Sequence, residues 1–406
     1  MTMINYADEV PLPHLKRRKK KKTNKRRTNK TNKSSPSWSS LPDALALSCV
    51  ARLTRQDYLA LSLVSKSHRA LVASPELVRA RTLIGCTEPT FCVCLRIFPD
   101  LTPSWFFLNR NRRLRRIPSN PYQAPESSSF VVVDWGIYVI GGISNGNRPT
   151  SDVWFLDCFS RTWRQAPSMK MARASASASF VDGKIYVFGG CDDHSNWAEV
   201  FDPKTQTWNL LSVPKMPHGI HQSVVIEGKK VYAVDEEEYQ SFSFSPSECK
   251  FWTRNRKRDY KRGYRNDWCA IGKVLFCRGS RRRILWCEPD NDFDWKEVKG
   301  LEEDLKNSLS GSRLYYHGAL DALYSKPIDI NYEISSLSSN SAGNIVIFWS
   351  VQLENPKHLE LWSAEISVER REGGEIWGKF EWSGAVFKLH PRSYSVKVLY
   401  SASVHV

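Results

Sequence analysis

The segment Lys184-Ile185-Tyr186-Val187-Phe188-Gly189-Gly190 decides the fold, because an apolar run ends there at two consecutive glycines. β-branched and aromatic residues suit a pleated strand, and a run that is apolar at every position indicates a sheet buried on both faces. The glycines allow positive φ without a Cβ penalty, so the strand ends at them. Asp202-Pro203-Lys204-Thr205 then predicts a type I turn. One unit is therefore about four short strands.

The same order of residues occurs upstream, where Gly136-Ile137-Tyr138-Val139-Ile140-Gly141-Gly142 also ends at two glycines. Tyr138 and Tyr186 are 48 residues apart, and the tryptophans that close the two units, Trp163 and Trp208, are 45 apart. A fixed period of this length is typical of repeat proteins. Radial stacking of four-stranded sheets buries both faces of each sheet, so the repeat predicts a β-propeller.

Two further copies lack the glycine pair but keep the closing tryptophan. The closing tryptophans follow one another at spacings of 45, 44 and 43 residues: Trp163, Trp208, Trp252 and Trp295. Trp382 closes a last copy 87 residues beyond Trp295, which is about two periods. The interval holds either a cryptic unit or an insertion. We predict an insertion at 299–335, because this stretch shows no clear series of strands.

The last residues of the sequence also suit strands, at Ser395–Leu399 and Ala402–Val404. Pairing of these strands with strands predicted within residues 90–117 would close the ring, because closure removes exposed sheet edges. Counting this composite unit gives six blades, with five and seven as alternatives.

A Tyr-x-x-Gly-Gly strand, then a Val-Trp-x-x-Asp or Val-Phe-Asp-Pro strand and then Trp resembles the kelch repeat. Two clear copies carry the resemblance, at about 129–166 and 177–212. The resemblance implies a mainly β fold over residues 84–406, namely a kelch-type β-propeller of about six four-stranded blades whose C-terminal strand closes the ring.

Residues 41–83 have a different character, with short apolar stripes at helical spacing. Pro42 suits the first turn of a helix, and Thr54 with an acid three residues later predicts a helix start of the capping-box type. Ser74-Pro75-Glu76 predicts another helix start. Three or four short helices form only a small core, and such a module usually gains stability from a partner.

These helices resemble the F-box motif in Leu41-Pro42, in Cys49–Leu53 and in Leu61–Lys66. With the kelch repeats behind it, this segment resembles the plant F-box/kelch-repeat family. The resemblance implies a small all-α F-box module at 38–83 that docks on a Skp-type adaptor, which joins a cullin–RING ubiquitin ligase. By position it implies an adaptor-facing set: Leu41, Pro42, Leu45, Val50, Leu61, Val64 and Ser65. Each apolar member could instead pack the core of the module.

Three hypotheses about function remain open. The favoured one is a non-catalytic substrate-recognition subunit of an SCF-type ligase, in which the propeller holds an unidentified protein for ubiquitination and degradation. The second is a protein-interaction propeller without ligase activity, and the third is a small-molecule or metal enzyme on a kelch propeller. Because binding residues concentrate on loops, the candidate substrate contacts are loop segments: Ser144–Arg148, Cys191–Asn196 and Pro217–Gly219.

No combination of residues predicts a catalytic site, a metal site or a cofactor. His218 and His221 have no third ligand at metal-site spacing, and Gly189-Gly190 has no nearby Lys-Ser/Thr pair to cradle a phosphate. The copper ligands of kelch oxidases cannot be placed on this sequence. The eight cations of Lys250–Arg265 could bind an acidic partner, although a charge run is more often a solvated face.

The N-terminal residues carry much of the charge. Residues 1–40 contain twelve Lys or Arg and two acids, so they contribute +10 of the net +17. Because Lys16–Lys33 contains no apolar residue, residues 1–37 are predicted to be a disordered basic tail. Its clusters indicate either a nuclear localisation signal or a solvated tail that attracts anions. We expect the nucleus and/or the cytoplasm, and non-specific nucleic-acid contact is not predicted as a function, because no base-reading motif is present.

Other features of the sequence limit the classes of protein to which it can belong. No apolar stretch reaches the roughly 18 residues of a membrane-spanning helix, and no secretory signal is evident at the N-terminus. The ten cysteines include no Cys-x-x-Cys pair, which argues against a zinc site and for reduced thiols in an intracellular protein.

Overall fold

The computed structural model describes residues 42–100, 102–117, 126–144, 148–191, 196–213, 219–235, 240–248, 250–255, 268–289, 293–315, 326–354 and 357–406. Contacts divide the chain into two units, and of the described residues 42–46 belong to one and 47–406 to the other. The basic tail predicted at 1–37 lies outside the described residues.

Four short helices come first in the described chain: α1 (Asp43–Ala51), α2 (Arg55–Val64), α3 (Lys66–Val72) and α4 (Pro75–Leu83). The predicted helix starts are present. The backbone N–H of Thr54 donates to the Asp57 carboxylate at 3.0 Å before α2, and Ser74 Oγ accepts the Leu77 N–H at 3.3 Å before α4. Side-chain caps therefore set the bounds of these helices.

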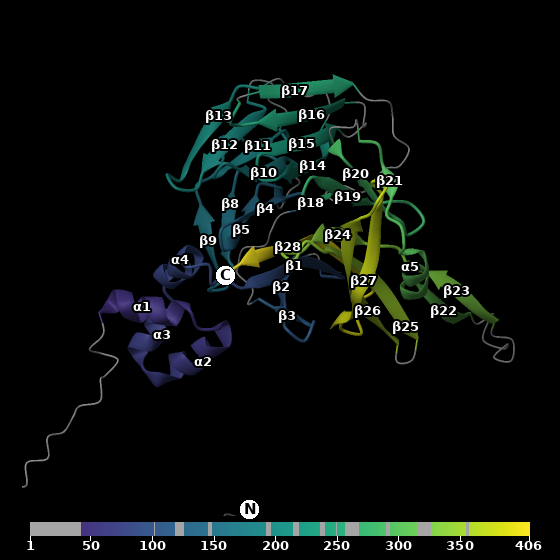
Figure 1. Cartoon of the computed structure of the whole chain (residues 1–406), viewed down its shortest axis with the longest axis horizontal. Helices are drawn as coiled ribbons and strands as arrows, with labels where there is room; N and C mark the ends of the chain where they lie inside the picture. Colours follow the sequence, from purple (N-terminus) through teal and green to yellow (C-terminus); the bar gives the residue numbers. More distant parts are fainter. Residues whose placement is uncertain are drawn as a thin grey trace, which may run out of the picture. The chain divides into compact units, whose positions relative to one another are not determined.

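Six four-stranded antiparallel sheets follow and form the blades of a β-propeller (Figure 1). Blade 1 consists of β4 (Ser129–Val133), β5 (Gly136–Ile140), β8 (Val153–Asp157) and β9 (Thr162–Ala166). Blade 2 consists of β10 (Ser177–Val181), β11 (Lys184–Phe188), β12 (Ala198–Asp202) and β13 (Thr207–Leu211). Blade 3 consists of β14 (Ile220–Ile226), β15 (Lys230–Asp235), β16 (Gln240–Ser245) and β17 (Lys250–Asn255).

The remaining blades are built in the same way. Blade 4 consists of β18 (Cys269–Ile271), β19 (Val274–Arg278), β20 (Ile284–Cys287) and β21 (Lys296–Glu297). Blade 5 consists of β24 (Ser336–Ser339), β25 (Ile345–Glu354), β26 (Lys357–Arg370) and β27 (Ile376–Lys388). The closing blade consists of β28 (Ser395–His405), β1 (Pro89–Phe98), β2 (Ser104–Leu108) and β3 (Leu114–Arg116). A small two-stranded sheet of β6 (Ile143–Ser144) and β7 (Arg148–Pro149) lies between β5 and β8.

The ring is closed by the last strand of the chain. β28 pairs with β1 in antiparallel register, from Pro89 opposite His405 to Phe98 opposite Ser395. The prediction of a six-bladed propeller closed by the C-terminal strand is thus confirmed. The glycine pair of blade 2 behaves as predicted, since Gly190 has φ +73° and a Cβ there would lie 2.6 Å from the Ala174 carbonyl oxygen.

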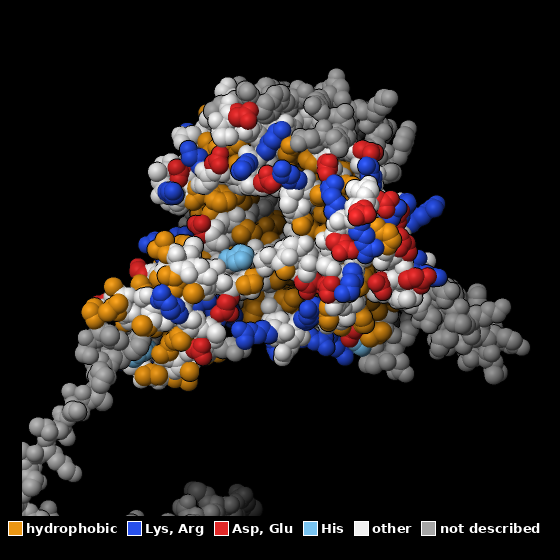
Figure 2. Space-filling model, in the orientation of Figure 1, with side chains coloured by type: hydrophobic (Ala, Val, Ile, Leu, Met, Phe, Trp, Pro, Cys, Tyr) orange, Lys and Arg blue, Asp and Glu red, His pale blue; other side chains and the backbone are white. Residues whose placement is uncertain are grey.

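Serine and alanine line the innermost strands, where the six blades converge. Ser129 Oγ donates to the Ala176 carbonyl at 2.7 Å, joining blades 1 and 2. Ser338 Oγ and Ser401 Oγ lie 2.7 Å apart and join blade 5 to the closing blade. Small side chains fit here because a propeller tapers toward its axis. Figure 2 shows the ring hollowed at its centre.

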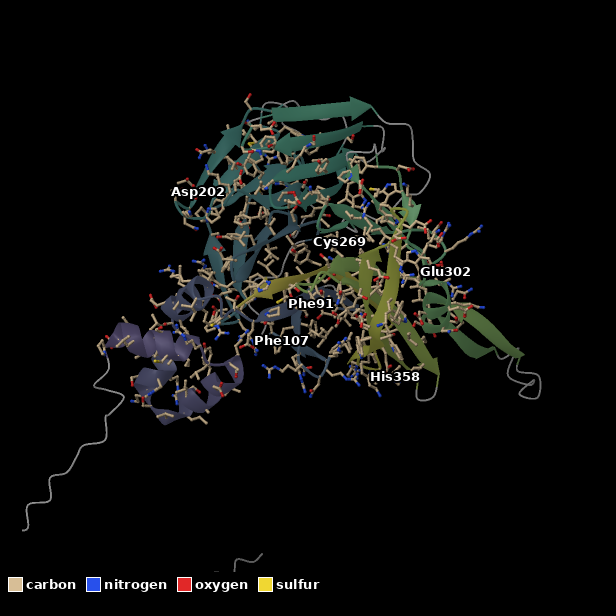
Figure 3. The ribbon with its side chains drawn as sticks, viewed as in Figure 1. Phe91, Phe107, Asp202, Cys269, Glu302 and His358 are labelled. Carbon is tan, nitrogen blue, oxygen red and sulfur yellow. The ribbon has the colours of Figure 1, made fainter. Side chains whose placement is uncertain are left out.

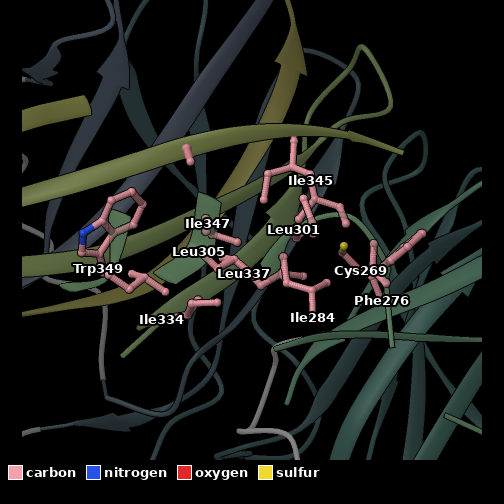
Figure 4. Packing of buried hydrophobic residues seen from close by; sticks show 14 of the residues in the cluster. Cys269, Phe276, Ile284, Leu301, Leu305, Ile334, Leu337, Ile345, Ile347 and Trp349 are labelled. Atoms are coloured by element: carbon pink, nitrogen blue, oxygen red, sulfur yellow. The ribbon is translucent and has the colours of Figure 1, made fainter. Parts of the chain in front are cut away.

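In the segment for which an insertion was predicted, residues 299–335, the described part contains a helix and two paired strands, between blades 4 and 5 in the chain. These are α5 (Glu302–Ser308), β22 (Ser310–Tyr315) and β23 (Lys326–Asn331). Leu301, Leu305 and Leu309 pack into the hydrophobic core that blades 4 and 5 share (Figure 4). The described part of this segment contains two strands, whereas each blade contains four. The domain bounds proposed from the sequence stay predictions.

The order of the strands gives the propeller two different faces. Connections between the second and third strands of a blade, and from one blade to the next, leave from one face, which we call the loop face. The connections between the first and second strands and between the third and fourth strands leave from the opposite face, the turn face. β1 begins at the turn face, so the chain passes from α4 into the propeller on that side.

Candidate functional site

Helix α2 presents large apolar side chains to solvent on the side that faces away from the core. Tyr58 is buried, and Leu61 packs against the same core. In contrast, Leu59, Leu63 and Val64 are 74%, 80% and 66% exposed. Leu59 and Leu63 are four residues apart, so they lie on one side of the helix. We call Leu59, Leu63 and Val64 the α2 apolar surface.

The α2 apolar surface has the composition of a protein-binding site. Adjoining exposed apolar side chains mark interaction surfaces in otherwise soluble domains, and Figure 2 shows hydrophobic side chains at the surface of these helices. Burial of each such side chain under a partner would contribute roughly 1.5–3 kcal/mol.

The structure exposes part of the set predicted to face an adaptor. Val64 belongs to the α2 apolar surface, and Pro42 and Leu45, at the start of α1, are also exposed. Leu41 lies outside the described residues. The exposed members can meet a partner without any rearrangement of the helices.

Other members of that set lie within the module. Val50 is fully buried and packs the core, so it supports the module from the inside in this structure. Leu61 is half-buried. Ser65 Oγ accepts the His68 N–H at 3.2 Å and caps α3, so its side chain already has a structural role.

Sequence reasoning missed Leu59 and Leu63. The signal was nonetheless present, because α2 carries apolar residues on both sides. A helix that is hydrophobic all round needs burial all round. One side of α2 packs on the core, and the other side is exposed.

A buried arginine links the helices to the propeller. Arg81 of α4 is 1% exposed. Its Nη1 donates to the carbonyl oxygens of Ala51 (3.2 Å) and Leu53 (2.6 Å) and to the hydroxyl of Tyr58 (2.6 Å). Its Nη2 donates to Glu88 Oε1 at 3.1 Å. One guanidinium thus joins the end of α1, helix α2 and the segment that leads into β1.

Glu88 is the second half of this link, which we call the Glu88 junction. The carboxylate oxygen that receives Arg81 also accepts the backbone N–H of Arg55 at 3.1 Å. The backbone of Glu88 exchanges two hydrogen bonds with Val406, at 2.7 and 3.0 Å. Arg55 Nη2 reaches the Phe159 carbonyl of blade 1 at 3.0 Å. The junction therefore couples the helices to the strand pair that closes the ring.

Burial shapes the electrostatics of the Glu88 junction. Burial raises the pKa of the Tyr58 phenol, although the hydrogen bond from Arg81 acts in the opposite direction. Burial and the positive charge of Arg161 both lower the pKa of Arg55. Positive charge is thus concentrated around a single carboxylate, Glu88.

The topology puts the described ends of the candidate substrate loops on the same face. Ser144, Arg148, Cys191 and Asn196 lie between the second and third strands of their blades, and Gly219 directly precedes blade 3, so these residues belong to the loop face. The structure describes Ser144, Arg148, Cys191, Asn196 and Gly219. The residues between them, His218 of the proposed His218/His221 pair among them, lie outside the described residues.

A fully buried ion pair organises the loop face at blade 2. Arg173 and Glu199 are both 0% exposed in their side chains, and Arg173 Nη2 lies 2.9 Å from Glu199 Oε1. The carboxylate also accepts the backbone N–H groups of Lys170 (2.8 Å) and Met171 (3.0 Å). The pair therefore fixes the connection between blades 1 and 2.

The guanidinium of Arg173 holds the neighbouring loop as well. It donates to the carbonyl oxygens of Gly189 (2.7 Å), Asn196 (2.6 Å) and Trp197 (2.9 Å). These carbonyls flank the candidate segment Cys191–Asn196 on both sides. Arg173 thus fixes the backbone at both ends of that segment.

Within the described residues, no three His, Cys, Asp or Glu side chains gather at metal-binding distance. A pocket of about 180 Å³ lies between blades 4 and 5, where Arg370 is paired with Glu288 at 2.6 Å beside Trp286. Its lining includes no histidine, serine or cysteine. No helix of the described chain is long and apolar enough to cross a membrane.

Comparison with known proteins gives matches to both parts of the chain. The F-box domain model matches residues 38–79, and the FKB95 Kelch-repeats domain model matches residues 103–387. A putative F-box/kelch-repeat protein of Arabidopsis thaliana is 36% identical over 434 residues, covering 100% of both chains. Another F-box/kelch-repeat protein of that plant is 36% identical over 380 residues, covering 90% of this chain and 92% of its own. The solved structure of YjhT aligns with 70% of this chain at 12% identity and a TM-score of 0.39, which is too low to support a conclusion.

Proposed function

Because the chain belongs to the F-box/kelch-repeat family, whose members are typically non-catalytic substrate adaptors, we propose that it is the substrate-recognition subunit of an SCF-type ubiquitin ligase. The F-box helices bind a Skp-type adaptor, and through it a cullin–RING ligase, while the propeller binds the target protein. The observation that carries the proposal is the α2 apolar surface, Leu59, Leu63 and Val64, on a module held by the Glu88 junction.

Such a subunit acts by proximity. The propeller holds a target protein close to the ubiquitin carrier, which raises the effective concentration of its lysines there. Transfer itself is catalysed by other subunits. The helices enter on the turn face, and the candidate contacts for the target belong to the opposite, loop face. The Glu88 junction keeps the adaptor-binding helices and the propeller in one arrangement, so the target is presented from a fixed direction.

The test is adaptor binding by a variant with Leu59→Asp and Leu63→Asp. We expect its affinity for a purified Skp-type adaptor to fall at least about 100-fold, because two large apolar contacts are replaced by charges that must be desolvated. Surface plasmon resonance measures the affinity, and a thermal melt checks that the variant is folded.

Leu210→Asp is the matched control, because Leu210 is an apolar residue that is 48% exposed on β13 of blade 2. It should bind the adaptor like the wild type. Equal affinity of the wild type and the α2 variant would contradict the proposed surface. Absence of binding by the wild type would leave a protein-interaction propeller without ligase activity.

We also propose that the basic tail directs part of the protein to the nucleus, with the remainder in the cytoplasm. The twelve Lys and Arg of residues 1–40 support this proposal, since dense basic clusters are typical of nuclear localisation signals. Replacing the cations of residues 16–22 and 25–27 with glutamine in a fluorescent fusion tests it. An unchanged distribution would contradict it.

A further inference from the structure

The closing blade carries a dense group of arginines on its outer edge. The turn between β2 and β3 and the strand β3 contain five arginines within seven residues: Arg110, Arg112, Arg113, Arg115 and Arg116. Residues 104–117 contain no acidic residue. Figure 2 shows Lys and Arg side chains gathered over β2 and β3, and Figure 3 places Phe107 of β2 in the same region.

One of the five is neutralised within the propeller. Arg112 Nη1 lies 3.1 Å from Glu365 Oε2, and its guanidinium lies 4.6 Å from the ring centre of Trp382. This arginine ties the closing blade to blade 5, so its charge is already matched. We call the other four the arginine rim: Arg110, Arg113, Arg115 and Arg116.

Two rim arginines bind neutral acceptors. Arg113 donates to the Ala385 carbonyl oxygen at 2.7 Å, and Arg116 donates to Ser104 Oγ at 2.9 Å. Neither contact cancels the charge of the guanidinium. The pKa of the Asp100 carboxyl is lowered mainly by the hydrogen bonds from Thr102, and the positive charge of Arg116 lowers it slightly further.

Arg110 pairs with a carboxylate that other arginines also use. Its Nη2 lies 3.6 Å from Glu88 Oε2, and Glu88 also receives Arg81 and the backbone of Arg55. Next to them, Arg161 lies with its guanidinium 3.9 Å from the ring centre of Phe107. This edge of the described structure thus carries more positive than negative charge.

The arginine rim is continuous with the α2 apolar surface through the Glu88 junction. Glu88 contacts Arg110 of the rim and Arg55, the first residue of α2. Leu59 and Leu63 follow Arg55 by four and eight residues, which is about 6 and 12 Å along a helix. A protein interface of standard size buries about 800 Å² on each partner and is roughly 30 Å across. A partner seated on α2 can therefore also cover part of the rim.

Protection of a sheet edge does not explain the whole rim. Charged side chains on an edge strand prevent pairing with other chains, but β3 is only three residues long and would need a single charge for that purpose. Arg110 and Arg113 lie in the turn, outside the strand. The number of charges, and the link from Arg110 through Glu88 to the first residue of α2, favour an anionic partner.

We infer that the arginine rim is a second contact for the adaptor and receives an acidic segment of it. This inference rests on the proposed function. An apolar centre with a charged periphery is the usual anatomy of a protein interface. Charges at the periphery act mainly on the rate of association, because they steer the partners toward each other before contact.

The test uses Arg115→Glu with Arg116→Glu, both exposed on β3. At low salt, we expect the association rate constant with a purified Skp-type adaptor to fall about tenfold, with a nearly unchanged dissociation rate constant. At about 1 M salt the difference should vanish, because the Debye length is then about 3 Å. Stopped-flow fluorescence over a series of salt concentrations measures both rate constants.

Lys184→Glu with Lys204→Glu is the matched control, because both lysines are exposed in blade 2 and the change in net charge is the same. This control should associate within about twofold of the wild type. If the rim variant associates as fast as the control while Leu59→Asp/Leu63→Asp loses binding, the rim inference is wrong and the proposed function stands. If the wild type does not bind the adaptor, both are wrong. Equal slowing of the rim variant and the control would show a general charge effect and would also overturn the inference.

Discussion

Replacing Arg81 with methionine is expected to lower the free energy of unfolding of residues 47–406 by about 3–5 kcal/mol, because one partner of a buried hydrogen-bonded charge network is removed. The carbonyl oxygens of Ala51 and Leu53 and the hydroxyl of Tyr58 lose their donor. Each buried polar group left without a partner costs about 1–3 kcal/mol. Glu88 is partly exposed, so water can replace Arg81 there, and the cost falls mainly on the helices.

A thermal melt detects this change. With an unfolding entropy of roughly 2.1 cal/mol/K per residue, a loss of this size lowers Tm by about 4–7 °C for a unit of this length. Arg79→Met is the matched control, because Arg79 is an exposed arginine of the same helix, α4. It should shift Tm by less than about 1 °C. Equal small shifts for the two variants would contradict the role of Arg81. The Arg81→Met variant should also bind the adaptor more weakly, because Arg81 supports helix α2, which carries the α2 apolar surface.

Much of the fold could be predicted from the sequence because a propeller is a local repeat. Two units carry strands, a glycine pair and a closing tryptophan, and two further units keep the closing tryptophan at nearly the same spacing, so a legible copy such as 177–212 indicates the weaker ones. Closure could be predicted as well, since an open ring would expose the edges of β1 and β28. The segment at 299–335 was harder to interpret, because its helix packs into a core made by blades 4 and 5 and has no repeat pattern of its own.

The candidate site was predicted less completely, for a physical reason. Whether a residue of a short helix faces the core or the solvent depends on the neighbouring helices, which a local pattern does not contain. Val50 and Leu59 are both apolar residues of the F-box helices, yet one is fully buried and the other is 74% exposed. The Glu88 junction was beyond sequence reasoning, because Arg81, Glu88 and Val406 meet only after the ring has closed.

A second large effect is expected from Arg173→Ala. The change leaves the Glu199 carboxylate, which is 0% exposed, without its counter-charge. It also removes one donor from each of the carbonyl oxygens of Gly189, Asn196 and Trp197. Breaking a buried ion pair by removing one partner costs about 3–5 kcal/mol, so we expect a fall in Tm of about 4–7 °C. Lys184→Ala, at an exposed position of the same blade, should leave Tm unchanged.

Replacing both partners, with Arg173→Met and Glu199→Leu, distinguishes the contribution of the ion pair to stability from the contribution of the hydrogen bonds to the loop. If the ion pair alone mattered, an apolar pair would be nearly as stable as the wild type. However, Glu199 also accepts the N–H groups of Lys170 and Met171, and these donors lose that acceptor in the double variant. We therefore expect the double variant to lose less stability than the single variants Arg173→Met and Glu199→Leu do in sum, with a coupling energy of roughly 1–3 kcal/mol. Full recovery would show that the loop is held by other contacts, and a loss equal to the sum of the single changes would show that the two side chains act independently.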